Sequence, residues 1–333
     1  MNTKELYQYL LTHQTLEKEV AKQLLVALSE GAYNPSQMAS ILTIFMMRSI
    51  TLSELSGFRE ALLELCIRVD FSDYNTIDVC GTGGDGKDTF NISTLASFVL
   101  AGAGFQVAKH GNYGVSSVSG SSNVMEILGV RFSNETDFLK KSLETCNIAI
   151  LHAPLFHPAM KEVGPTRREL GVKTFFNMLG PMVNPSFPKN QLVGVFSLEL
   201  ARMYAYLYQT TGVNFSILHD LNGYDEVSLT GDVKVVSNHK EEVLHPIHWN
   251  ADVLKAQEIK GGNSKEEAAA LFYSILKGDG TSAQNQVVCA NAAIAIEMLT
   301  GKSKEDSFLL ALESLKSGKA LNQLHKLQQI SQA

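Results

Sequence analysis

Residues 76–94 read TIDVCGTGGDGKDTFNIST, and this stretch decides the fold. Its first part, Thr76–Cys80, is typical of a short buried strand, and Ile92–Ala101 is apolar enough to predict a helix. The loop between them, Gly81–Asp88, begins with four glycines in six residues. A strand, a glycine-rich loop and a helix in this order create an anion site, because the loop and the helix N-terminus both expose backbone N–H groups.

A second segment of the same kind follows. Residues 109–122 read KHGNYGVSSVSGSS, after the predicted strand Phe105–Ala108 and before the predicted helix Asn123–Leu128. Its lysine offers a point charge to phosphate, its glycines open the backbone, and its serines add hydroxyl donors. Ten of the 25 glycines lie within residues 81–129, about a seventh of the chain. We therefore expect two ligand-binding loops; the alternative for this second segment is a plain Ser/Gly linker.

Two nucleotide-binding patterns partly match the first loop. Gly81, Gly83 and Gly86 satisfy the dinucleotide fingerprint, but the cationic pair Lys109-His110 occupies the place of the acid that would bind a ribose. The P-loop pattern fails at Asp88, which stands where a magnesium-binding hydroxyl belongs.

A third interpretation makes use of the acid inside the loop. Asp85 can bind sugar hydroxyls or act through a metal, and Asn91, Ser93 and Thr94 add an amide and two hydroxyls at the helix start. This set suits a phosphorylated sugar with magnesium. The remaining alternative is an ordinary turn in which Asn91 or Ser93 caps the helix.

Strands and helices alternate from about residue 74 onward, which predicts a mostly parallel central sheet flanked by helices. Residues 1–66 predict helices only, with an apolar stripe at Ala21, Leu24, Leu25 and Leu28 and helix starts at Asn34-Pro35 and Thr51. The fold class is thus α/β with a small N-terminal helical domain. Further strands are predicted at Ile148–Leu151, Gln191–Val195 and Phe215–Leu218, a hairpin of Val227–Leu229 with Val233–Val236 around Gly231-Asp232, and helices at Leu198–Gln209, 264–277, 284–299 and 304–317.

Composition excludes several classes of protein. The net charge of −6 argues against a nucleic-acid partner, and no apolar run is long enough to span a membrane. We also expect no signal peptide. The four cysteines, Cys66, Cys80, Cys146 and Cys289, are far apart and form no CxxC pair. They predict neither a zinc site nor a disulfide framework, so the expected compartment is the reducing cytoplasm.

Several ordered motifs resemble the anthranilate phosphoribosyltransferase family of tryptophan biosynthesis, which has a nucleoside-phosphorylase-like fold. The resemblance covers nearly the whole chain. It is carried by the motifs 81–85, 91–94 and 109–121, then His157-Pro158-Ala159-Met160, 167–171, 176–181, Gly223-Tyr224-Asp225-Glu226, Asn291-Ala292-Ala293 and 317–320.

The resemblance implies an activity and its components. The family joins anthranilate to phosphoribosyl pyrophosphate, giving N-(5-phosphoribosyl)anthranilate and pyrophosphate, with two magnesium ions per site. It further implies a helical domain of residues 1–68, with a contribution from about 167–185, that forms a homodimer, and a catalytic α/β domain of residues 69–333. The partners are the two small-molecule substrates, with no nucleic acid and no membrane.

The resemblance also implies the site residues. No acid, base or nucleophile is expected, because the aromatic amine attacks an oxocarbenium-like C1 once both substrates are positioned. The phosphoribosyl pyrophosphate ligands would be Gly81, Gly84, Asp85, Thr89, Asn91, Ile92, Ser93, Thr94, Lys109, His110, Gly111, Asn112, Tyr113, Gly114, Val115, Ser116, Ser117 and Ser121. The anthranilate residues would be Gly81, Asn112, Arg167, His110 and His157, and the metal ligands Ser93, Asp225 and Glu226.

One departure from the family pattern stands out. The family usually has arginine after Lys-His-Gly-Asn, where this chain has Tyr113, so a positive charge is missing beside the diphosphate. Two rival functions remain open. One is a pyrimidine nucleoside phosphorylase, which shares the fold, and the other is a non-catalytic homologue that binds nucleic acid.

Overall fold

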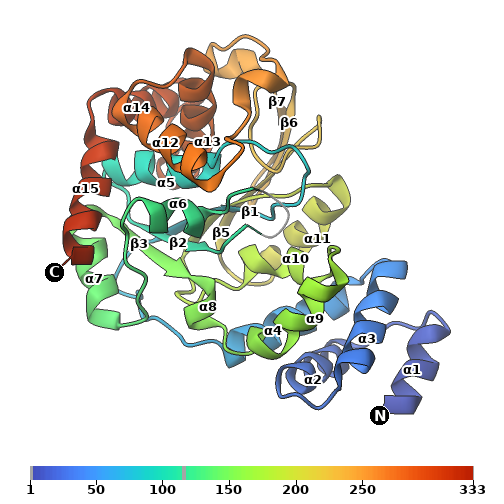
Figure 1. Ribbon diagram of the computed structural model, residues 1–333. Helices are drawn as coiled ribbons and strands as arrows, with labels where there is room; N and C mark the ends of the chain where they lie inside the picture. The colour runs from blue at the N-terminus through green and yellow to red at the C-terminus, as the bar shows by residue number, and fades with distance from the viewer. Residues whose placement is uncertain (1–2, 115–117, 333) are drawn as a thin grey trace. The chain divides into compact units, whose positions relative to one another are not determined.

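The computed structural model describes residues 3–114 and 118–332 (Figure 1). The chain divides into two compact units, Met1–Arg68 with Pro154–Pro185, and Val69–Ala153 with Ser186–Ala333. The second segment of the first unit thus begins at Pro154, earlier than the expected start near residue 167. The α/β unit is correspondingly interrupted between residues 153 and 186.

The first unit is helical, as the sequence predicts. Asn34 and Thr51 each form a capping box with the third helical residue, Gln37 and Glu54 respectively, so both predicted helix starts are confirmed. The predicted stripe at residues 21, 24, 25 and 28 is buried. Its elements are α1 (Thr3–Leu11), α2 (Lys18–Ser29), α3 (Pro35–Met47), α4 (Leu52–Leu65), α9 (Met160–Leu170), α10 (Phe176–Leu179) and η1 (Gly180–Met182), and α8 (Ala153–Phe156) begins at the boundary.

Aromatic packing joins the two segments of the helical unit. The Phe175 ring stacks on that of Phe58 with centroids 4.4 Å apart, and it meets Phe45 edge to face at 5.4 Å. Phe175 precedes α10, whereas Phe58 and Phe45 lie on α4 and α3. Aromatic pairs add stabilisation beyond the area they bury. Residues 154–185 therefore share one core with the N-terminal helices.

A buried ion pair lies in the same unit. The Glu54 carboxylate is 0% exposed and accepts hydrogen bonds from the Arg48 guanidinium at 2.6 and 3.0 Å. It also accepts from the backbone N–H groups of Leu16 and Thr51, at 2.8 and 2.9 Å. Burial by itself would raise the pKa of Glu54, but Arg48 and these N–H groups overcome that effect and lower it.

Replacing Glu54 by Gln is expected to destabilise the helical unit by about 3 kcal/mol, because Arg48 is left buried without a counter-charge. Because these partners favour the charged carboxylate, the wild-type protein should lose stability as the pH drops below the ordinary pKa of glutamate. The loss continues as the pH falls through the lowered pKa of Glu54. Thermal melts at pH 3 to 7 measure both effects. Glu60→Gln is the matched control, because its exposed pair with Lys18 should contribute less than about 1 kcal/mol. Equal losses in both variants would contradict this account.

The second unit is built on one mixed sheet. Within the described residues it has seven strands in the order β3-β2-β1-β4-β5-β6-β7, of which the first five are parallel and β6 and β7 are antiparallel. The sequence-based expectation of a mostly parallel sheet is confirmed. The strands are β1 (Ile77–Gly81), β2 (Val107–Gly111), β3 (Ile148–His152), β4 (Asn190–Gly194), β5 (Asn214–Asp220), β6 (Val233–Ser237) and β7 (Glu241–Leu244).

Helices flank this sheet. Three helices distant in sequence, α13, α14 and α15, pack on α5 (Figure 1), while α12 packs on α6 and α11 packs on β5. The middle of α5 is fully buried, so it lies in the centre of the core. The helices are α5 (Ile92–Gly102), α6 (Ser121–Ile127), α7 (Thr136–Cys146), α11 (Leu198–Gln209), α12 (Lys265–Lys277), α13 (Ser282–Thr300), α14 (Lys304–Lys316), α15 (Lys319–Gln332), and the short η2 (Pro246–Trp249) and η3 (Ala256–Ile259).

One predicted element is wrong. Residues 227–229 form no strand, and β6 pairs with β5 and β7 instead of forming a hairpin around Gly231-Asp232. Val227 and Leu229 belong to a loop, although their side chains are buried. The backbone of Val227 hydrogen-bonds the Asn291 side chain of α13, and Leu229 has a left-handed backbone conformation. Apolar side chains that point into a core from a loop cannot be told from a short strand by pattern alone.

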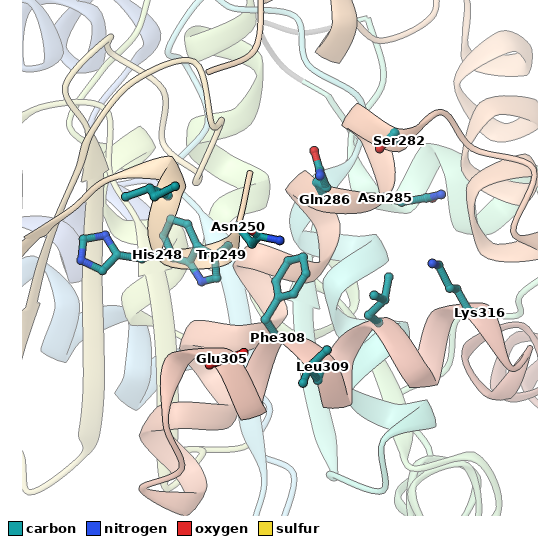
Figure 2. Close-up of a pocket in the computed structure, with 12 residues that line it drawn as sticks. His248, Trp249, Asn250, Ser282, Asn285, Gln286, Glu305, Phe308, Leu309 and Lys316 are labelled. Carbon is teal, nitrogen blue, oxygen red and sulfur yellow. The ribbon is translucent and has the colours of Figure 1, made fainter. Parts of the chain in front are cut away.

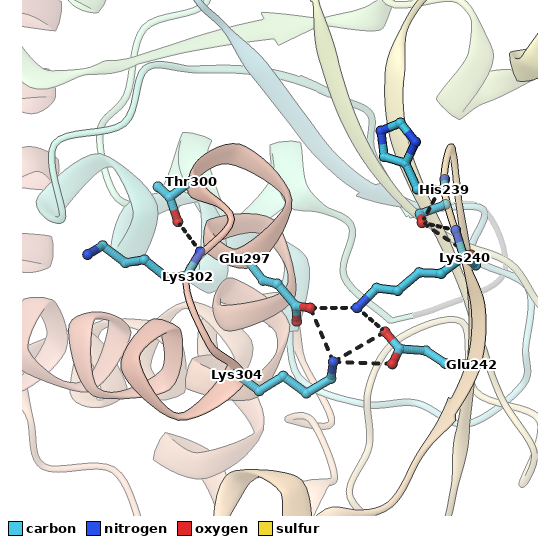
Figure 3. A network of polar contacts seen from close by, with 8 residues as sticks. His239, Lys240, Glu242, Glu297, Thr300, Lys302 and Lys304 are labelled. Atoms are coloured by element: carbon cyan, nitrogen blue, oxygen red, sulfur yellow. Dashed lines mark hydrogen bonds and ion pairs between the residues drawn. The ribbon is translucent and has the colours of Figure 1, made fainter.

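Four charged side chains close a ring at the edge of this unit (Figure 3). Lys240 lies 2.7 Å from both Glu242 and Glu297, and Lys304 lies 3.2 and 3.1 Å from the same two carboxylates. The carboxylates raise the pKa of Lys240 although partial burial opposes them. The ring links β7 to α13 and α14, because each lysine joins two elements.

None of the helices among the described residues is both long and apolar enough to cross a membrane.

Candidate functional site

Both glycine loops leave the sheet at the same edge. Gly81 ends β1 and Gly111 ends β2, and these strands are parallel neighbours. From β1 the chain moves to β2 on one side, and it later returns to β4 on the other side of β1. This reversal of strand order is the point at which open α/β sheets bind their ligands.

The Asp225-Glu226 pair lies against the first glycine loop. The N–H of Gly83 donates to Asp225 Oδ2 at 2.6 Å, and the N–H of Ser93 donates to Glu226 Oε1 at 2.8 Å. Because Ser93 is in the first turn of α5, the Glu226 carboxylate faces the positive end of that helix. A Cβ at Gly81 would collide with the Asp225 carboxylate, so glycine permits this close approach.

The carboxylates of this site repel one another. Burial and the nearby charge of Asp85 raise the pKa of Asp225 to about 7. Burial and the charge of Asp225 raise the pKa of Glu226 well above its ordinary value. The carboxylates of Asp85, Asp225 and Glu226 offer hard oxygen atoms, and their negative charges repel one another. Such a set suits a cation such as Mg²⁺.

These carboxylates are not a complete metal cage. Among residues 3–114 and 118–332, no three His, Cys, Asp or Glu side chains are grouped closely enough to hold an ion by themselves. Mg²⁺ usually uses one or two protein carboxylates and takes its other oxygens from water and substrate phosphate. The donor set therefore fits an ion that binds together with a phosphorylated substrate.

The rest of the first loop is tied to its surroundings. Gly84 has a left-handed backbone, with φ of 77°, and Asp85 accepts a hydrogen bond from the N–H of Lys87 at 3.1 Å. The Lys87 ammonium lies 4.8 Å from the centre of the Tyr224 ring, next to Asp225. No sequence motif predicts this cation–π contact, which joins the loop to the carboxylate segment.

The remaining predicted residues of this segment have different surroundings. Thr89 forms an isolated antiparallel bridge with Lys260, and Ile92 and Thr94 are buried in α5. Asn91 Nδ2 donates to the carbonyl of Ser119 at 3.2 Å. Since Ser119 belongs to the second glycine loop, Asn91 links the two loops directly.

Lys109 and His110 are buried at the end of β2. Lys109 is 2% exposed, and its Nζ donates to the carbonyl of Val79 at 2.6 Å. Burial lowers the pKa of Lys109, while the charges of Asp78 and Glu226 oppose that effect. The N–H of His110 donates to Asp78 Oδ1 at 3.2 Å. Lys109 therefore balances buried carboxylates, and Asp78 is a site acid that its apolar strand pattern did not reveal.

The second glycine loop folds back on itself. The carbonyl of Asn112 accepts from the N–H of Ser122 at 3.1 Å and from Ser121 Oγ at 3.4 Å. Asn112 Oδ1 accepts from the N–H of Tyr113 at 2.8 Å. A Cβ at Gly111 would collide with Ser121 Oγ. The predicted ligands Val115, Ser116 and Ser117 lie outside the described residues.

Tyr113 has definite partners. Its hydroxyl donates to Glu126 at 3.2 Å, and its ring meets the His152 ring edge to face with centroids 4.8 Å apart. His152 also contacts Ser122 Oγ at 2.8 Å and stacks on Phe132. The position at which the resembled family usually has arginine is thus anchored on α6 and β3 by an uncharged ring.

The two predicted anthranilate residues of the helical unit are buried to different degrees. Arg167 is half-buried on α9, with its guanidinium 4.9 Å from the centre of the Phe176 ring and within 3.5 Å of Asn177 Oδ1. Burial lowers the pKa of Arg167 to about 10, so it stays charged at neutral pH. His157 is buried, and burial lowers its pKa to about 4, which keeps it neutral.

A separate groove lies between η2, α13 and α14 (Figure 2). It measures about 770 Å³, and Trp249, Phe308 and Leu309 line it together with the charged ends of Glu305 and Lys316. None of the predicted site residues lines this groove. The loop edge described above therefore contains the candidate active site.

Comparison with known families identifies the class of protein. Residues 73–321 match the family described as glycosyl transferase family, a/b domain, and residues 4–66 match its helical bundle domain. The chain therefore belongs to this glycosyl transferase family, which agrees with its sheet and its glycine loops.

Sequence identity to curated relatives shows which enzymes within this glycosyl transferase family the chain resembles most specifically. The anthranilate phosphoribosyltransferase of Flavobacterium johnsoniae is 66% identical over 322 residues, which are 97% of this chain and 98% of the relative. That of Flavobacterium psychrophilum is 63% identical over 328 residues, covering 98% and 99%. Within the glycosyl transferase family, the chain is thus a member of the anthranilate phosphoribosyltransferase family, and the resemblance seen in its motifs is confirmed.

Solved structures agree with the fold. The Thermus thermophilus anthranilate phosphoribosyltransferase superposes with a TM-score of 0.91, at 33% identity and over 100% of both chains. The Saccharomyces cerevisiae enzyme, solved in complex with phosphoribosyl pyrophosphate and magnesium, gives a TM-score of 0.91 at 25% identity, over 99% of this chain and 98% of that one.

Proposed function

We propose that this chain transfers the phosphoribosyl group of phosphoribosyl pyrophosphate to the amino group of anthranilate, in tryptophan biosynthesis. The observation that carries the proposal is the contact of Asp225 and Glu226 with the first glycine loop and the start of α5. It sets magnesium-type oxygen ligands beside backbone N–H groups that suit phosphate. The relative solved with phosphoribosyl pyrophosphate and magnesium supports the same chemistry.

Magnesium would be held by Asp225 and Glu226, with Ser93 as the third predicted ligand, and we propose two ions per site. When bound, magnesium neutralises charge on the departing pyrophosphate. The raised pKa values of the two acids support this assignment, because a cation relieves their mutual repulsion.

The chain's own groups act mainly by positioning. The backbone N–H groups of the two loops orient the diphosphate, and the buried Lys109 ammonium adds positive charge beneath them. Asn91 keeps the two loops in register through Ser119. With the diphosphate fixed, C1 of the ribose faces the amine as the C1–O bond breaks, and the amine loses its proton late.

Arg167 is the proposed partner of the anthranilate carboxylate. A guanidinium can grip a carboxylate with two hydrogen bonds, and the Phe176 ring beneath it limits its freedom. Buried, neutral His157 is proposed to border the same substrate.

Replacing Arg167 by Ala is expected to raise the KM for anthranilate about tenfold or more and to leave the KM for phosphoribosyl pyrophosphate within about twofold, since a charge-assisted bond is lost. Steady-state kinetics with each substrate varied measures both values. Arg168→Ala is the matched control, because Arg168 is exposed on the same helix. An unchanged KM for anthranilate in the Arg167 variant would refute its role.

The assembly and compartment are also proposals. The helical unit exposes large apolar side chains, including Met47 at 79% and Leu11 at 64%, which supports a homodimer formed through this unit. Light scattering after size exclusion tests it, and a monomer at micromolar concentration would refute it. The cytoplasm is the compartment that four free cysteines favour.

The function is tested by product analysis. Protein, magnesium, phosphoribosyl pyrophosphate and anthranilate together should yield N-(5-phosphoribosyl)anthranilate and pyrophosphate in equal amounts, and omitting any one component should abolish both. Formation of pyrophosphate without the anthranilate product would contradict the proposal.

A further inference from the structure

One buried amide oxygen holds both ends of the second glycine loop. Asn123 Oδ1 accepts from the N–H of Gly114 at 3.0 Å and from the N–H of Gly120 at 3.0 Å. Asn123 is 5% exposed and lies in the first turn of α6. An amide oxygen has two lone pairs, so the single side chain can satisfy both donors at once.

The two ends also touch each other. A Cβ at Gly120 would collide with the backbone nitrogen of Gly114 and would lie only 2.6 Å from the carbonyl oxygen of Asn112. The N–H of Ser122 donates to that same carbonyl at 3.1 Å. We call these contacts, made by Asn112–Gly114 with Gly120–Asn123, the neck of the loop. The neck fixes where the loop leaves β2 and where it enters α6.

The neck decides which backbone N–H groups are left for a ligand. The N–H groups of Gly114 and Gly120 are engaged by Asn123, and that of Tyr113 by Asn112 Oδ1. These donors therefore hold the loop in shape. Without the amide oxygen, two part-buried N–H groups would need other partners, and the loop would rearrange to supply them.

We propose that Asn123 is a positioning residue for the diphosphate of phosphoribosyl pyrophosphate, acting through its oxygen on the neck of the second glycine loop. The proposal rests on the proposed function of that loop. Asn123 itself does not need to touch the substrate. What the reaction requires is the acceptor, not the size of the side chain.

Two substitutions distinguish a need for the acceptor oxygen of Asn123 from a need for the shape of its side chain. Asn123→Leu keeps the number and branching of the side-chain heavy atoms and removes the oxygen, and it should raise the KM for phosphoribosyl pyrophosphate about 10- to 100-fold, with the KM for anthranilate within about twofold. Asn123→Asp keeps an oxygen at the same place and should stay within about threefold of wild type. Titration calorimetry with magnesium and phosphoribosyl pyrophosphate should give the same order of affinities.

A matched control tests a merely structural role. Asn190 is also a buried asparagine, bonded to Asn75, Thr76 and Asn214, but it starts β4 and so lies at the opposite edge of the sheet. Asn190→Leu should lower the Tm yet leave the KM for phosphoribosyl pyrophosphate unchanged.

The inference fails if folded Asn123→Leu binds phosphoribosyl pyrophosphate as wild type does, or if the Leu and Asp variants are impaired equally. It also fails if Asn190→Leu raises that KM as much. Failure of the proposed function is distinct, because wild-type protein would then form no N-(5-phosphoribosyl)anthranilate from phosphoribosyl pyrophosphate and anthranilate.

Discussion

Replacing Asp225 by Asn and Glu226 by Gln together is expected to lower kcat/KM for phosphoribosyl pyrophosphate about a thousandfold. A metal that stabilises a leaving group contributes several kcal/mol, and each 1.36 kcal/mol is a factor of ten in rate. Added magnesium should not restore activity, because the amides keep the shape of the site but lose its charge. Kinetics at 0.1 to 10 mM magnesium measure the loss.

The same double variant should be at least as stable as wild type without magnesium. In the wild type, Asp225 and Glu226 are buried and repel each other and Asp85, which is why the pKa values of the two acids are raised. Glu297→Gln is the matched control: this partly buried glutamate belongs to the ring in Figure 3, and its loss should lower the Tm but leave the magnesium dependence intact. Full activity of the double variant at low magnesium would disprove the metal role.

Replacing Gly81 by Ala is expected to cost about a hundredfold in kcat/KM while the fold survives. The new Cβ would displace the Asp225 carboxylate, which the N–H of Gly83 now holds at 2.6 Å. A misplacement of about 1 Å at a reacting centre can cost two orders of magnitude. The Tm should change little, since a short side chain can move where a backbone cannot.

Alanine substitutions at two other glycines serve as controls for the Gly81→Ala prediction. A Cβ at Gly180 meets no atom within 4 Å, so Gly180→Ala should leave activity and Tm near wild type. A Cβ at Gly194 would instead collide with the backbone carbonyl of Asp225, so Gly194→Ala should lower the Tm as well as the activity. Wild-type kinetics in folded Gly81→Ala would show that Asp225 does not need its observed position.

Local pattern was sufficient for most of the fold. The helix starts at Asn34-Pro35 and Thr51 were predictable because capping depends on residues three apart. Most parallel strands were predictable because they are buried apolar runs bounded by glycine or polar residues. The hairpin at Gly231-Asp232 was not, because the burial of Val227 depends on Asn291, 64 residues away.

The sequence predicts the loops of the candidate site but not how they are arranged. Two glycine loops after neighbouring strands must meet at one edge of a parallel sheet, so their proximity follows from the pattern. The contact of Gly83 with Asp225 joins positions 142 residues apart, and only the resemblance to a family suggested it. Asn123 looked like an ordinary residue at a helix start, because its double acceptance depends on the path of the whole loop.

Lys109 shows the same limit. As a lysine after a strand it is predicted to offer a point charge to phosphate, and the structure buries its ammonium against the carbonyl of Val79. The sequence does not say whether a lysine side chain turns toward solvent or toward the sheet. Buried Asp78 and the site acids supply the charge that makes the inward position tolerable.

The most direct test of the account is the loss of anthranilate fluorescence when the protein, magnesium and phosphoribosyl pyrophosphate are mixed with anthranilate. We expect a loss that requires all four components and that nearly disappears in the Asp225→Asn, Glu226→Gln double variant. No loss with wild-type protein, together with phosphorolysis of uridine or thymidine, would contradict it and assign the site to a nucleoside phosphorylase.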